Sequence, residues 1–144
     1  MNPLAEKVIN TCEAVFNANS ANCSGFAKAV STTFDIELSG LADEIVDEIK
    51  TGEWVSLNDG IDAKNKADEG WLVIGGLKGH DNNPPQSHGH VVVVVSGPLD
   101  GSHHKYPTAY WGKLGSTGKK NTPLNFAWNS ESRDRVIYAG IKLT

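Results

Sequence analysis

Cys23 has the sequence surroundings expected of a reactive cysteine. It follows Asn22, a residue type that often caps the start of a helix, and the apolar residues Phe26 and Val30 recur four positions apart after it. This spacing predicts a helix over residues 22–33 with Cys23 in its first turn. The unpaired N–H groups and the positive dipole end of such a helix would lower the pKa of the thiol and create a nucleophile. The competing interpretation is a small buried hydrophobe, which is the usual role of a free cysteine.

A nucleophilic thiol needs a proton acceptor, and histidine is the side chain whose pKa suits that role near neutral pH. His90 is the best placed of the five histidines, because it follows Gly89 and precedes the valine run 91–95. Such a run predicts a buried strand, from whose end the imidazole would project. We therefore predict that the folded chain brings Cys23, on a helix, to His90, on a strand, and that the pair carries out acyl transfer.

The elements that would position this pair divide into helices first and strands second. A first amphipathic helix begins at Asn2 and Pro3 and carries Cys12 on its apolar stripe, where packing is the expected role. A third helix covers residues 41–49 and has an acidic outer face, which we interpret as solvated. The residues of that face are Asp43, Glu44, Asp47 and Glu48.

Four segments in the second half have the composition of strands. The first ends at Gly75-Gly76, and the unbroken valine run predicts that both faces of its strand are covered. The order of elements predicts an α+β fold in which the N-terminal helices pack on one side of an antiparallel β-sheet. The expected strands are 71–74, 90–95, 105–111 and 133–143; the segment 54–68 is expected to be irregular with a short helix at 63–67, and loops at 79–88 and 112–122 are expected to border a cleft.

Composition limits the classes of protein to which the chain can belong. With 144 residues and 39% hydrophobic content, it has the size of one domain spanning residues 1–144. A formal net charge of −4 argues against a nucleic-acid-binding surface. The N-terminal residues lack the pattern of a signal peptide, no apolar run is long enough to cross a membrane, and no disulfide is expected between Cys12 and Cys23.

Five blocks of sequence, spread over nearly the whole chain, carry a resemblance to a known family. They are Asn22-Cys23-Ser24-Gly25-Phe26, the segments 70–79 and 89–99, Lys105-Tyr106-Pro107, and Trp128-Asn129 with Arg133-Asp134-Arg135. Together they resemble the first family of type VI secretion amidase effectors. The resemblance implies an NlpC-type, papain-like fold and a cysteine peptidase that cuts the peptide stem of bacterial peptidoglycan between D-glutamate, through its γ-carboxyl group, and meso-diaminopimelate. It makes Cys23 the nucleophile and His90 the general base and later acid, with no cofactor and no metal.

One position departs from the family pattern. Related enzymes orient the catalytic histidine with a third group, and the best-matching pattern has a cysteine where this chain has Trp111. An indole N–H donates a hydrogen bond but cannot accept one from imidazole. The third orienting group therefore stays open among a backbone carbonyl, Thr108 and Tyr110.

The resemblance also implies where such a protein acts and what it meets. It implies synthesis in the cytoplasm without a signal peptide, loading into a type VI secretion apparatus, and action in the periplasm of a target Gram-negative cell. The implied partners are the peptidoglycan stem and a cognate periplasmic immunity protein, for which residues 43–48 and 112–122 are candidate contact surfaces. The protein is expected to be a monomer that binds neither nucleic acid nor membrane.

Three alternatives remain beside the effector. One is a non-secreted cell-wall lysin of the same fold. Another is a metal-binding protein, because His88 and His90 share a face on a strand and can be joined by His103 or His104. The last is a wall-binding module without hydrolytic activity, with an aromatic surface formed by Trp54, Trp71, Trp111 and Trp128.

Overall fold

The fold is built on an antiparallel sheet of six strands, and the computed structural model describes all of residues 1–144. The strand order is β1-β6-β2-β3-β4-β5. The strands are β1 (Val55–Leu57), β2 (Trp71–Leu77), β3 (His90–Val94), β4 (Thr108–Trp111), β5 (Lys119–Pro123) and β6 (Ile137–Lys142). The α-helices are α1 (Pro3–Asn19), α2 (Cys23–Thr33), α3 (Ala42–Glu48) and α4 (Gly60–Asp68), with short 3-10 turns at Gly79–Asp81, Leu124–Phe126 and Arg133–Arg135.

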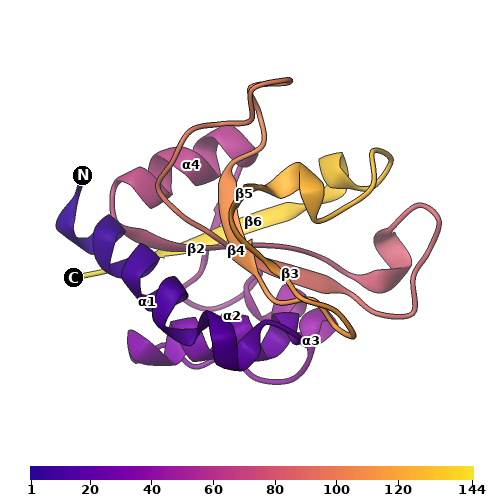
Figure 1. The fold of residues 1–144 in the computed structure, drawn as a ribbon, viewed down its shortest axis with the longest axis horizontal. Helices are drawn as coiled ribbons and strands as arrows, with labels where there is room; N and C mark the ends of the chain where they lie inside the picture. Colours follow the sequence, from indigo (N-terminus) through magenta and orange to yellow (C-terminus); the bar gives the residue numbers. More distant parts are fainter.

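Helices cover both faces of this sheet. Helices α1, α2 and α3 lie on one face and α4 on the other (Figure 1). The valines of β3 show the division, because Val91 and Val93 belong to the core under α1–α3 while Val92 and Val94 belong to the core under α4. The α+β class and the coverage of both faces of this strand are thus confirmed. Helix α4 adds a layer that the prediction of helices on one side does not contain.

Strand β2 runs further than the sequence predicts. We expect Gly75-Gly76 to end it, but it continues to Leu77, and Gly76 pairs with Val91 of β3. A β-carbon at Gly76 would lie 2.8 Å from Cγ2 of Val46 on α3 and 3.0 Å from Cγ1 of Val91. The glycine therefore allows α3 to approach the sheet closely and does not break the strand.

Weakly patterned segments form more structure than the sequence predicts. The short helix predicted at 63–67 is confirmed as part of the longer α4, but the segment 54–68 also holds β1, and the expected loop 112–122 contributes most of β5. Strands β1 and β5 are the two edges of the sheet, where one face and one side stay exposed and apolar periodicity is weak. Strands β4 and β6 also begin later than predicted. Residues 105–107 precede the first residue of β4 that pairs in the sheet, and residues 133–135, before β6, form a 3-10 turn.

The acidic face of α3 is exposed or half-buried, as predicted, and two of its carboxylates also make structural contacts. Asp43 accepts a hydrogen bond from the backbone N–H of Gly79 at 3.0 Å. Asp47 forms an ion pair with Lys78, with 2.6 Å between Oδ1 and Nζ. Both contacts attach α3 to the start of the loop that leads from β2 to His90.

The two cysteines are both free thiols, and Cys12 is fully buried on α1, as its apolar stripe predicts. None of the helices combines the length and the apolar character that a membrane crossing would need.

Candidate active site

Helix α2 begins at Cys23, as the spacing predicts. Asn22 is the N-cap, and its side-chain oxygen accepts hydrogen bonds from the backbone N–H of Gly25 and from the Ser24 hydroxyl, both at 2.9 Å. The backbone N–H groups of Cys23 and Ser24 donate to no oxygen atom of the protein and lie beside the Cys23 sulfur. The first turn therefore presents two free donors beside the thiol, as the start of a helix does when its cap satisfies a later N–H.

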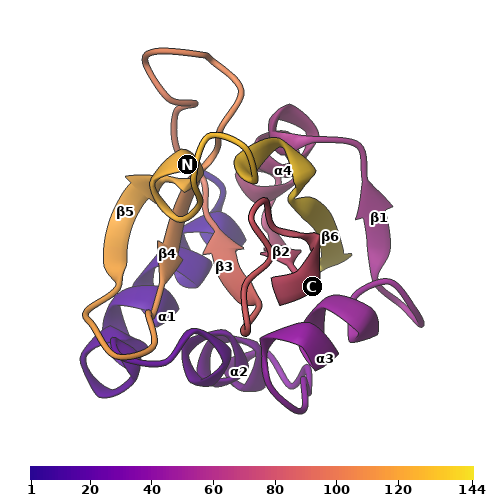
Figure 2. The ribbon, with the colours of Figure 1, turned by 90° about the vertical axis from the view of Figure 1, so that its right-hand side faces the viewer.

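Cys23 lies against the sheet and is only 8% exposed. Burial raises the pKa of the Cys23 thiol, although the backbone N–H groups of Val91, Ser24 and Cys23 itself act to lower it. The predicted lowering of this pKa is wrong, because loss of solvent outweighs the groups that favour a thiolate. The sulfur is thus a neutral thiol that lies next to the backbone of β3, under which α2 packs (Figure 2).

His90 is the first residue of β3, immediately before the Val91 N–H that interacts with Cys23. Its ring packs edge-on against two indoles, with centroid distances of 6.4 Å to Trp111 and 5.1 Å to Trp128. Burial, and to a lesser degree the charge of Lys113, lowers the pKa of His90 to about 4. His90 is therefore neutral at pH 7, which is the form that can accept a proton.

The turn after β4 links the surroundings of these two residues. The backbone N–H groups of Lys113 and Gly118 donate to the carbonyl oxygen of Ser20, three residues before Cys23, at 3.0 and 2.8 Å. The Lys113 side chain at the same time lies close enough to His90 to act on its pKa. Cys23 and His90 thus share one end of the sheet, but no hydrogen bond joins the thiol to the imidazole.

None of the proposed side chains orients His90. Thr108 donates to the carbonyl oxygen of Pro98 at 2.7 Å, and the Tyr110 hydroxyl donates to Glu13 on α1. The two indoles are what contact the ring, and they hold it by packing instead of by a hydrogen bond. Both hydroxyls therefore donate elsewhere in the fold, and the third orienting group stays open.

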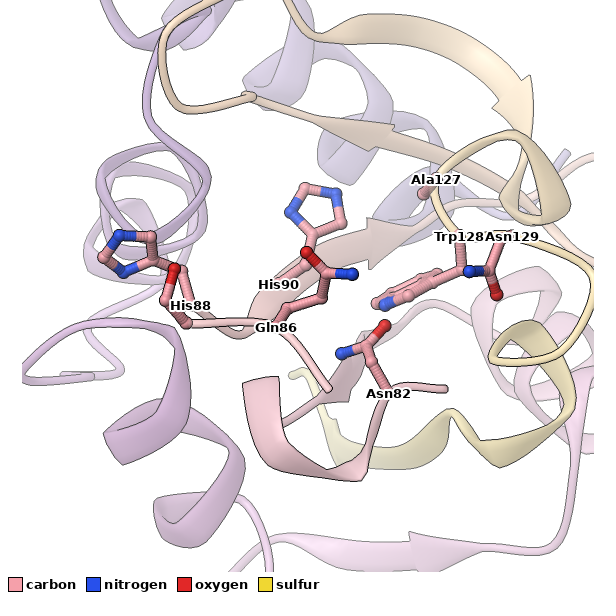
Figure 3. A pocket seen from close by; sticks show the side chains of 8 residues that line it. Asn82, Gln86, His88, His90, Ala127, Trp128 and Asn129 are labelled. Atoms are coloured by element: carbon pink, nitrogen blue, oxygen red, sulfur yellow. The ribbon is translucent and has the colours of Figure 1, made fainter. Parts of the chain in front are cut away.

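A pocket of about 270 Å³ opens beside His90. Two loops form it: the segment 82–88, which precedes β3, and the segment 127–129 (Figure 3). The loop 79–88 is thus confirmed as the border of a cavity. The lining residues are Asn82, Gln86, Ser87, His88, His90, Ala127, Trp128 and Asn129.

The loop 82–88 is attached to the opposite wall of this pocket. The N–H of Asn83 donates to the Ser132 hydroxyl at 2.9 Å, and the side-chain N–H of Asn129 donates to the carbonyl oxygen of Asn83 at 3.1 Å. Ser132 is fully buried. The pocket therefore has walls that hydrogen bonds hold in place.

The histidines do not gather into a metal site. His103 lies in a turn, where its ring nitrogen is 3.1 Å from a carboxylate oxygen of the buried Asp100, and His88 lines the pocket beside His90. No group of three or more His, Cys, Asp or Glu side chains is arranged to hold a metal ion.

The chain is 34% identical to the peptidoglycan amidase Tse1 of Pseudomonas aeruginosa, in an alignment of 149 residues that covers 96% of this chain and 91% of that protein. The chain belongs to this peptidoglycan amidase family. The resemblance carried by the five sequence blocks is thereby confirmed. No family model matches the chain.

Sequence reasoning missed most of the polar residues that surround His90 in this amidase-family chain. Asn82 and Gln86 lie in the loop that was expected to border a cleft, but neither is singled out by its type or spacing. Trp128 belongs to one of the resembling blocks, yet nothing in the sequence places its ring on His90. Only the polar character of the loop directly before His90 signals these contacts.

Proposed function

We propose that this protein is a peptidoglycan amidase, and more narrowly a cysteine peptidase that cuts the bond between the γ-carboxyl group of D-glutamate and meso-diaminopimelate. The observation that carries the proposal is the position of Cys23 in a chain of the peptidoglycan amidase family. Cys23 begins a helix and lies beside the backbone of Val91, the residue that directly follows His90. A thiol at the start of a helix and an imidazole on the adjoining strand are the two groups that acyl transfer requires.

The proposed reaction starts from a neutral pair. His90, neutral at pH 7 because its pKa is about 4, removes the proton of the Cys23 thiol as the sulfur attacks the amide carbonyl carbon. The unpaired N–H groups of Cys23 and Ser24 donate to the oxygen that becomes negative in the tetrahedral intermediate. His90 then gives its proton to the leaving amine, and water hydrolyses the thioester with His90 again acting as base.

Two features support a thiol that reacts only when substrate is bound. Burial keeps Cys23 protonated in the free protein, and no hydrogen bond yet joins it to His90. Catalytic hydrogen bonds are often long in the absence of substrate and shorten in the complex. The substrate therefore has to bring the sulfur, the imidazole and the carbonyl carbon into line.

We further propose that residues 1–144 act as one catalytic domain of an antibacterial type VI secretion effector. Such an effector would reach the periplasm of a target Gram-negative cell and would be inhibited there by a cognate immunity protein. The membership in the peptidoglycan amidase family supports a wall substrate, and the delivery route is the part that secretion experiments have to test.

Digestion of purified peptidoglycan by three forms of the protein tests the proposed function. The wild type should release fragments whose masses correspond to cleavage after γ-D-glutamate, and Cys23→Ala should release none. Cys12→Ala is the matched control, because Cys12 is the other thiol and is fully buried on α1, where substrate cannot reach it. A Cys23→Ala protein that still cuts, or a wild type that binds peptidoglycan and leaves its stems intact, would refute the assignment.

A further inference from the structure

The pocket beside His90 contains a hydrogen-bond donor that the protein does not use. Trp128 is 9% exposed, and its indole nitrogen is buried without a partner. Figure 3 shows the indole with its nitrogen turned into the pocket, on the side where Gln86 and Asn82 lie. A buried N–H that lacks a partner destabilises the protein alone, so a ligand atom that accepts its hydrogen bond is strongly favoured.

The side-chain amides of the pocket already have partners for their N–H groups. The side-chain N–H groups of Asn82, Gln86 and Asn129 donate to backbone carbonyl oxygens at 3.0, 3.2 and 3.1 Å. The side-chain oxygen of Asn129 accepts from a backbone N–H at 2.8 Å, whereas those of Asn82 and Gln86 accept nothing. The pocket therefore offers a ligand the buried N–H of Trp128 and two free amide oxygens, beside the Ser87 hydroxyl and the rings of His88 and His90.

The charge and size of the pocket narrow the ligand further. None of its lining residues is Asp, Glu, Lys or Arg, so neither a carboxylate nor an ammonium group would find an opposite charge there. Its volume of about 270 Å³ is at the small end of ligand sites, which suits one residue-sized group and excludes a whole stem. A buried, unpaired N–H beside two free amide oxygens complements a peptide amide, which has a carbonyl oxygen and an N–H.

We propose that this pocket binds an uncharged peptide amide of the substrate next to the scissile bond, and that Trp128 donates the hydrogen bond to its carbonyl oxygen. The inference rests on the proposed function and names the part of the stem peptide that this site recognises. Because the ring of Trp128 also packs on His90, an amide held by its N–H would lie at a fixed distance from the general base. Trp128 is then a substrate-binding residue that aligns the scissile carbonyl with Cys23.

Binding to the full chain carrying Cys23→Ala separates this inference from catalysis. The probe is the stem tripeptide L-alanyl-γ-D-glutamyl-meso-diaminopimelate, and the readouts are its Kd by calorimetry and the indole N–H resonances of ¹⁵N-labelled protein. On binding, the Trp128 resonance should move downfield, as that of a newly bonded N–H does. Trp128→Phe should weaken binding about tenfold, which is the loss of one hydrogen bond from a desolvated donor.

An isosteric replacement distinguishes the N–H from the ring. Benzothienylalanine at position 128 keeps the bicyclic ring against His90 but replaces the N–H by sulfur, and it should weaken binding about as much as Trp128→Phe. Trp71→Phe is the control and should leave Kd unchanged. Trp71 lies on β2, with the ammonium group of Lys66 over its ring, and does not line the pocket. Wild-type affinity in the benzothienylalanine protein, or an unmoved Trp128 resonance in a complex that forms, would overturn the inference while the proposed function stands. Absence of both peptide binding and peptidoglycan cleavage by the wild type would overturn both.

Discussion

Gly89, directly before His90, should be intolerant of any side chain. A β-carbon at this position would lie 2.2 Å from Oδ1 of Asp43 and 3.0 Å from the carbonyl oxygen of Leu77. The first contact is far inside van der Waals distance, so the Asp43 carboxylate has to move. The same oxygen accepts the hydrogen bond from Gly79 at 3.0 Å, which is lost when it moves.

The magnitude follows from these contacts. Loss of one partly buried hydrogen bond to a charged acceptor costs about 1–2 kcal/mol, which is the effect expected of Asp43→Ala alone. Gly89→Ala should cost about 2–3 kcal/mol, because the close contact with the backbone oxygen of Leu77 adds to the same loss. In Asp43→Ala/Gly89→Ala the carboxylate is already absent, so the second substitution should add only about 1 kcal/mol.

Urea denaturation of the wild type, the two single variants and the double variant measures these free energies of unfolding. Peptidoglycan digestion by the folded Gly89→Ala protein should also be slower, because the start of β3 carries His90. The explanation requires that the two substitutions be non-additive. If the double variant loses the sum of the single effects, the contact between Gly89 and Asp43 is not what restricts this position.

Three further predictions concern the pH dependence, a buried carboxylate and the pocket loop. The rate constant kcat/KM should rise with pH through a midpoint near 4, where His90 loses its proton. Lys113→Gln should shift this midpoint upward, because a positive charge no longer disfavours the imidazolium form of His90. A wild-type midpoint at the ordinary histidine pKa would contradict the burial of His90 as the cause of its lowered pKa. Burial raises the pKa of Asp100, but hydrogen bonds from the backbone N–H groups of Tyr106, Lys105 and His103 outweigh burial and lower this pKa. The ionised Asp100 therefore stabilises the fold above the ordinary aspartate pKa, and this stabilisation is lost as the pH falls through the lowered pKa. Asp100→Ala should therefore cost about 2–4 kcal/mol of unfolding free energy at neutral pH and flatten the loss of stability in acid, as thermal denaturation at several pH values would show. Ser132→Ala removes the hydroxyl that accepts a hydrogen bond from the N–H of Asn83 and should lower the free energy of unfolding by about 1–2 kcal/mol. It should also raise KM for stem peptides with little change in kcat, whereas an unchanged KM would mean that this hydrogen bond does not shape the pocket.

The sequence alone predicts the parts of the fold that depend on local patterns. Asn22 before an apolar repeat predicts a helix that starts at Cys23, and the helix starts there because the cap interactions involve only neighbouring residues. The valine run predicts a strand covered on both faces, and its alternate side chains do enter two cores. The sequence blocks also predict the family to which the chain belongs.

Tertiary structure decided the environment of the candidate site. Burial raises the pKa of Cys23, although its place at a helix start predicts the reverse, because desolvation depends on what packs over the sulfur from distant segments. Trp128 meets His90 only through the docking of one loop on another, which leaves no local pattern. Gly76 is likewise a point of close helix approach and not a strand end, since its role depends on Val46, a residue of α3. Local hydrogen bonds can be read from neighbouring residue types, whereas burial, pKa and pocket shape arise from contacts between residues far apart in the chain.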